Sequence, residues 1–174
     1  PPTLAIDDVT VSEGDGTADF TVTRSGAAGG TTTVDYATQD NTATAGSDYT
    51  AITTTTLTFS PGDTTKTISV TITDDSSVES AETFYVNLSN IADASSASES
   101  ITDDQGLGTI NDNDTAGITV NPTSGLTTTE VGGTATFTVV LNTQPTDDVT
   151  IGLSSDDTTE GTINKSSVVF TSAN

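Results

Sequence analysis

The sequence predicts an all-β protein with one antiparallel β-sandwich of about seven strands, followed by a partial second β-sandwich. Met is absent and Lys and Arg total only three, whereas Thr, Ser, Gly and Asp are abundant, so helix formers are few and β-branched residues common. Short stretches of alternating apolar and polar residues recur along the chain and end at turn residues. Both observations are typical of a sandwich and not of βαβ units.

The first part of the chain supplies seven alternating stretches, each with one apolar face. They are Leu4 to Ile6, Ala18-Phe20-Val22, Val34-Tyr36, Leu57-Phe59, Ile68-Val70-Ile72, Phe84-Val86-Leu88 and Leu107 to Ile110. Turn and loop residues separate them at Glu13 to Gly16, Gly26 to Gly30, Ser60 to Asp63 and Asp93 to Gln105. We expect the last segment, the longest, to be a mobile loop.

The pattern starts again after Thr115. The matching pairs are Leu4-Ala-Ile6 with Ile118-Thr-Val120, Ala18-Asp-Phe20-Thr-Val22 with Ala135-Thr-Phe137-Thr-Val139, and Leu57-Thr-Phe59 with Val168-Val-Phe170. The stretch Val149-Thr-Ile151 continues the repeat. An internal repeat of this kind indicates two units of one fold. We therefore predict domains at residues 1–115 and 116–174, the second holding only the first half of a sandwich.

The charge narrows the range of partners. The chain carries 25 acidic and three basic residues, a net charge of −22 at pH 7, which would repel phosphate backbones and anionic lipid heads. Nucleic acid and membrane insertion are therefore not expected. Self-repulsion destabilises a compact fold unless cations bind, so the composition favours bound divalent metal or a high-salt milieu. The alternative is an acidic surface that only keeps the protein soluble.

The chain contains no cysteine, so neither disulfides nor a thiolate metal site can stabilise it. It also contains no histidine, and its only bases are Arg24, Lys66 and Lys165, so the sequence does not predict an enzyme. A carboxylate pair could in principle hydrolyse glycosides, which is the weaker alternative. No apolar run reaches the ~20 residues of a membrane span, and Pro1 opens the chain without a signal sequence, so we expect a mature product or an excised segment.

Acidic residues of the first part gather at loops expected at one end of the sandwich. They are Glu13, Asp48, Asp74, Asp75, Glu79, Glu82, Asp112 and Asp114. Calcium takes six to eight oxygen ligands, and several loops must supply them together. Without a cation these carboxylates would repel one another, so the clustering predicts a calcium site. In a simpler interpretation Glu13 and Asp48 occupy turns, and Asp112 and Asp114 form a polar linker.

Six motifs in order resemble the Calx-β domain of sodium–calcium exchangers, integrin β4 and many large bacterial surface proteins. They are Val11-Ser-Glu13-Gly, Ala45-Gly-Ser-Asp48-Tyr49, Leu57-Thr-Phe-Ser-Pro-Gly-Asp63, Ile72-Thr-Asp74-Asp75, Glu79-Ser-Ala-Glu82-Thr-Phe84 and Gly108-Thr-Ile-Asn-Asp112-Asn-Asp114. They cover nearly all of residues 3–114. The resemblance implies an immunoglobulin-like sandwich that binds Ca²⁺ through the eight acidic residues named above and a backbone carbonyl near Ser77.

The sequence also departs from the exchanger pattern. Ser76 and Asn113 stand where that pattern has further acidic residues, so we expect one or two ions. The second repeat keeps Glu130 at the position of Glu13 and Glu160 near that of Asp48. It has no counterpart of the Asp pair, the Glu-x-x-Glu or the final Asp cluster, so we expect its calcium site to be incomplete.

The expected function is a calcium-binding structural or adhesive module of an extracellular, secreted or cell-surface protein, in which calcium stiffens a tandem rod of neighbouring repeats. One alternative is a regulatory calcium sensor. Another is a subunit of an extracellular polymer, in which a strand from an identical subunit completes the second repeat. Glycosylation sequons occur at Asn87, Asn113 and Asn164, as a Ser- and Thr-rich chain contains by chance.

Overall fold

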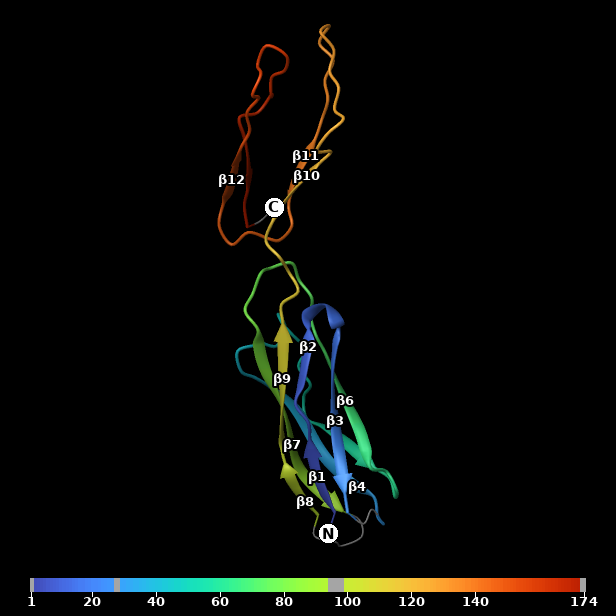
Figure 1. Cartoon of the computed structure of the whole chain (residues 1–174). Coiled ribbons are helices and arrows are strands. Elements are labelled where there is room, and N and C mark those ends of the chain that lie inside the picture. Colours follow the sequence, from blue (N-terminus) through green and yellow to red (C-terminus); the bar gives the residue numbers. More distant parts are fainter. Residues whose placement is uncertain (1, 27–28, 94–98, 173–174) are drawn as a thin grey trace. The chain divides into compact units, whose positions relative to one another are not determined.

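The computed structural model describes residues 2–26, 29–93 and 99–172 (Figure 1). The chain divides into two compact units, one of Pro1–Asp75 and Ser80–Asn113 and the other of Ser76–Glu79 and Asp114–Asn174. The boundary that the repeat predicts, between Thr115 and Ala116, stays a prediction. No helix among the described residues is long and apolar enough to cross a membrane.

Nine strands and one short 3₁₀ helix make up the described part of the first unit. They are β1 (Thr3–Ile6), β2 (Val9–Ser12), η1 (Glu13–Asp15), β3 (Thr17–Ser25), β4 (Thr32–Asp40), β5 (Thr55–Phe59), β6 (Thr65–Thr71), β7 (Glu82–Asp93), β8 (Ser100–Asp103) and β9 (Gln105–Asn111). All seven predicted strands are present. The expectation of one loop from Asp93 to Gln105 is wrong, because β7 ends at Asp93, β8 lies inside the segment and β9 begins at Gln105; residues 94–98 lie outside the described residues.

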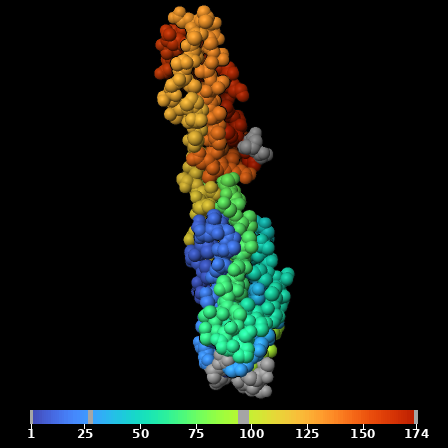
Figure 2. Space-filling view, turned by 90° about the vertical axis from the view of Figure 1, so that its right-hand side faces the viewer, coloured from blue at the N-terminus to red at the C-terminus, as the bar shows by residue number. Residues whose placement is uncertain are grey.

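The strands form two sheets, in the orders β6-β3-β1-β8 and β2-β9-β7-β4-β5. The neighbours β3 and β6 lie side by side on the surface (Figure 2, blue and green). The predicted β-sandwich is confirmed, and its pairings are antiparallel except for two parallel ones, β1 with β8 and β2 with β9. The parallel pairs arise because the chain changes sheets between β1 and β2, at Asp7 and Asp8.

The two aspartates at this crossing replace the missing strand partners. Oδ1 of Asp7 accepts the backbone N–H of Thr21 on β3 at 2.7 Å, and Oδ1 of Asp8 accepts that of Leu107 on β9 at 2.8 Å. Backbone donors need such partners wherever a ladder is interrupted. Each aspartate therefore completes the bonding of the sheet beside it.

The alternating apolar residues of both sheets meet in one core. Phe20 on β3 and Phe84 on β7 are fully buried, and their rings meet edge to face with centroids 5.8 Å apart. The Tyr49 ring stacks on Phe84 at 4.5 Å. At Gly108 of β9 a Cβ atom would lie 2.5 Å from Cε1 of Phe84, so only glycine lets β9 cross this ring. This aromatic group fixes how the two sheets pack.

The second unit contains β10 (Ile118–Asn121), β11 (Thr138–Leu141), β12 (Val149–Gly152) and β13 (Ser167–Phe170) among its described residues. These strands form two antiparallel pairs, β10 with β11 and β12 with β13. β11 begins at Thr138, so the expectation that the strand starts at Ala135 is wrong. None of the described residues 114–172 is buried, which contrasts with the continuous core of the first unit.

Candidate metal site

The edge where β2 and β9 end places two acidic residues side by side. The two strands run parallel, and their last paired residues are Ser12 and Asn111. Glu13 and Asp112 follow these partners directly, so they leave the sheet together. Glu13 begins the helix η1, in which Oδ2 of Asp15 accepts the backbone N–H of Ser12 at 2.8 Å. This turn keeps the carboxylate of Glu13 inside the protein, with only 6% of the residue exposed.

Carboxylates gather into two groups at this end of the first unit. Carboxylate oxygens of Glu13 and Asp112, one from each residue, lie within 4.8 Å of each other. The second group, with the same spacing, consists of Asp48 and Glu82. All four residues belong to the first unit, whereas the predicted ligands Glu79 and Asp114 belong to the second.

The loop between β4 and β5 positions Asp48. Oδ2 of Asp48 accepts the backbone N–H of Thr44 at 2.6 Å, and the carbonyl of Asp48 accepts the backbone N–H of Thr73 at 3.0 Å. Gly46 has φ of +100°, a left-handed conformation that glycine adopts without strain, and its N–H bonds to the carbonyl of Tyr49. The tight turn therefore places Asp48 beside the segment that leads into Asp74.

Asp40 and Tyr49 close the same loop, and the sequence did not indicate their role. The Tyr49 hydroxyl donates to Oδ1 of Asp40 at 2.5 Å, and the backbone N–H of Ala45 donates to the same oxygen at 2.9 Å. These two donors hold the pKa of Asp40 below its ordinary value, the tyrosine contributing more. Burial, together with the bond to Asp40, raises the pKa of Tyr49. Asp40 therefore stays ionised and Tyr49 stays neutral.

The remaining predicted ligands lie outside the two groups. Asp74 is exposed, and its Oδ1 accepts a hydrogen bond from Nδ2 of Asn113 at 3.1 Å. A Cβ atom at Gly14 would lie 2.6 Å from that Nδ2 and 3.8 Å from Oδ1 of Asp74, so three loops converge at this point. Asp75 is exposed and Ser77 is half-buried. The ligand role of each predicted residue stays a prediction.

The donor set suits a hard cation. Both groups offer oxygen atoms alone, which Ca²⁺ prefers, and two carboxylates within 4.8 Å of each other repel until a cation neutralises them. Two of the chain's three basic side chains make contacts elsewhere. Lys66 pairs with Asp63 at 2.8 Å, and the guanidinium of Arg24 donates to Gly30 and Thr32. The arrangement can therefore hold a divalent cation between loops.

Known proteins resemble part of this chain in sequence and in fold. The profile of the Calx-beta domain matches residues 3–114. Sodium/calcium exchanger 1 of Canis lupus familiaris and that of Cavia porcellus are each 47% identical over 85 residues, which is 48% of this chain but only 9% of each exchanger. The chain thus spans less than a tenth of the length of these relatives.

Solved structures agree with the sequence match. The apo form of the Calx CBD1 domain superposes with a TM-score of 0.59 at 28% identity and covers 65% of this chain and 98% of that one. The calcium binding domain CBD12 of CALX1.1 gives a TM-score of 0.57 at 28% identity over 64% of this chain and 44% of that one. Residues 3–114 make up well over half of the chain, and with this fold they show that the chain belongs to the Calx-beta domain family.

Proposed function

We propose that the first unit binds Ca²⁺ at the end that carries Glu13, Asp48, Glu82 and Asp112. The observation that carries the proposal is the convergence of carboxylates from separate loops into two groups with oxygens within 4.8 Å. The similarity to a solved calcium binding domain of CALX1.1 supports it. Two groups fit one or two ions, in keeping with Ser76 and Asn113 replacing acidic residues.

The ion would link loops that are distant from one another in the sequence. Glu13 and Asp112 leave β2 and β9, whereas Asp48 lies in the β4–β5 loop and Glu82 begins β7. An ion shared by such residues connects elements distant in sequence, as a disulfide does in other small domains. Binding of this kind needs no catalytic group, so we propose a structural and not an enzymatic role.

At the level of the whole protein, we propose a structural or adhesive module of an extracellular protein in which calcium stiffens neighbouring repeats. The net charge of −22 and the absence of cysteine support it, because bound cations would supply the stabilisation that disulfides provide elsewhere. A regulatory calcium sensor is the second candidate, supported by the 47% identity to sodium/calcium exchanger 1. Association of identical subunits is a further alternative.

Calorimetric titration of Ca²⁺ into the 174-residue chain tests both the site and its role. We expect one or two ions per chain. A dissociation constant near 10⁻⁴–10⁻³ M is typical of extracellular modules, whereas 10⁻⁷–10⁻⁵ M is typical of sensors. The absence of any saturable heat up to 10⁻² M, a concentration of about ten times the weaker limit, would disprove the calcium site.

A further inference from the structure

The two units pair their first strands in the same register. In the first unit Leu4 lies opposite Arg24 and Ile6 opposite Val22; in the second, Ile118 lies opposite Leu141 and Val120 opposite Val139. These positions correspond in the sequence repeat. The pair β12–β13 likewise places Ile151 opposite Val168, as β4–β5 places Val34 opposite Leu57. The second unit has therefore formed the first half of the same fold.

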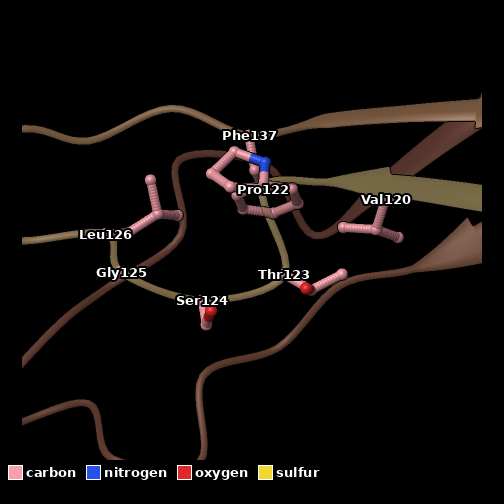
Figure 3. Close-up of a pocket in the computed structure, with 7 residues that line it drawn as sticks. All are labelled: Val120, Pro122, Thr123, Ser124, Gly125, Leu126 and Phe137. Atoms are coloured by element: carbon pink, nitrogen blue, oxygen red, sulfur yellow. The ribbon is translucent and has the colours of Figure 1, made fainter.

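The equivalent side chains differ sharply in exposure. Ile6 and Phe20 are 4% and 0% exposed, whereas their counterparts Val120 and Phe137 are each 38% exposed. Val120 and Phe137 line a pocket of about 440 Å³, together with Pro122, Leu126 and their neighbours (Figure 3). Since β10 and β11 pair in the same register as β1 and β3, the strands that cover this face account for the difference.

The first unit shows what those covering strands are. Residues 17–21 of β3 pair with β6 alone. Of their counterparts in the second unit, residues 134–137 belong to no strand, and β11 begins only at Thr138. Over the face itself, Phe84 of β7 contacts the Phe20 ring, and Gly106 and Gly108 of β9 pass so close that a Cβ atom would lie 3.0 and 3.1 Å from that ring. An edge strand, an aromatic side chain and a Gly-x-Gly strand therefore complete the fold.

We propose that the face of β10 and β11 around Val120 and Phe137 is a docking surface for a polypeptide segment with the strand pattern of β6, β7 and β9. The segment adds an edge strand to residues 134–138 and lays a Gly-x-Gly strand and an aromatic ring over Phe137. A second copy of this chain is the less suitable occupant, because its own β6, β7 and β9 are already paired inside its first unit.

The test attaches such a segment to the existing chain. A copy of residues 64–113 joined directly after Asn174 keeps the spacing that separates β5 from β6. We expect amide exchange of residues 134–137 to slow at least about 100-fold, because these amides become part of a paired strand. The signals of the Phe137 ring and Val120 methyl groups should shift in the same sample. Unchanged exchange at residues 134–137 would overturn the proposal.

Two variant pairs serve as controls. Gly106→Leu and Gly108→Leu, made only in the appended copy, should remove the protection without altering residues 1–174. Phe137→Ser should also remove it, whereas Val131→Ser, at a side chain that is 96% exposed, should not. Protection that survives both leucines would contradict the proposal. The unextended 174-residue chain gives a further test. If its amides at residues 134–137 exchange slowly only at concentrations where the molar mass also rises, a second copy covers the face and the proposal is overturned.

Discussion

The hydroxyl group of Tyr49 donates a hydrogen bond to Oδ1 of Asp40, 2.5 Å away, while the ring of Tyr49 stacks on Phe84 in the core. One side chain thus joins the β4–β5 loop to the centre of the sandwich. Asp48 directly precedes Tyr49, so its carboxylate is held in place by packing one residue away. Orientation of a ligand through such a neighbour commonly strengthens metal binding.

Tyr49→Phe should weaken calcium binding about tenfold, because the ring still packs on Phe84 but the bond to Asp40 is lost. Calorimetric titration of both proteins measures the change. Tyr36→Phe, on β4 and only half-buried, is the control and should bind calcium normally. Equal affinities for the wild type and Tyr49→Phe would show that the hydroxyl does not orient Asp48.

Asp40→Asn should make the free energy of unfolding fall less steeply as the pH is lowered. Tyr49 and Ala45 hold the pKa of Asp40 below its ordinary value of 3.8, so its contribution is complete above pH 3.8 and disappears as the pH falls through the lower, folded-state value. Urea unfolding at several pH values in EDTA measures the slope of the unfolding free energy. Asp19→Asn removes an exposed carboxylate of β3 and serves as the control; an identical acid slope for wild type and Asp40→Asn would contradict the prediction.

Calcium should raise the melting temperature of the first unit. An ion bound only by the folded protein stabilises it by about 2.7 kcal/mol at a hundredfold excess over the dissociation constant. Differential scanning calorimetry in calcium and in EDTA provides the measurement. Magnesium should stabilise far less, because it demands tighter octahedral geometry than separate loops offer. Identical melting curves in calcium and EDTA would rule out the site.

Glu82→Gln and Asp112→Asn should each remove most of the calcium-dependent rise in melting temperature, because each takes one carboxylate from one of the two groups. Asp19→Asn should leave that rise intact, although it changes the net charge equally. A similar loss in all three variants would mean that the acidic surface attracts calcium as a diffuse cloud.

Gly108→Ala should destabilise the first unit by about 1–3 kcal/mol, the usual cost of overfilling a packed core. The new methyl group would lie 2.5 Å from Cε1 and Cζ of Phe84. Chemical denaturation measures the change. Gly29→Ala is the matched control, because no atom lies within 4 Å of a Cβ atom there. If both variants were equally stable, β9 would not cross the aromatic ring as closely as described.

The strands that the sequence predicted are those whose apolar residues alternate, such as Ile68 and Val70 on β6. The two that it missed, β2 and β8, carry that signal only weakly or not at all. On β8 only Ile101 is apolar, and the strand exists because β1 pairs with it. β2 has Val9 and Val11 but is four residues long and follows Asp7 and Asp8, which favour turns. Short strands such as these form because they pair with strands distant in the sequence, and a local sequence pattern does not reveal such pairing.

The residues of the candidate site also fall into those that the sequence predicted and those that it missed. Motif order pointed to Glu13, Asp48, Glu82 and Asp112, and the structure brings their loops to one end. Asp40 and Asn113 were missed as supporting residues, because each acts through a side chain far along the chain: Tyr49 for Asp40, and Asp74 for Asn113. Hydrogen bonds of this kind follow no periodic pattern.

The crossing of the chain at Asp7 and Asp8 has a mechanical consequence. Because β2 and β9 run parallel, a force that pulls residues 1–8 away from residues 112–114 acts along the two strands in opposite directions. The hydrogen bonds between Val9–Ser12 and Gly108–Asn111 then bear the load together, in shear, and do not open one after another as in a hairpin pulled from its ends. A unit connected in this way resists stretching at the very strands that lead to Glu13 and Asp112.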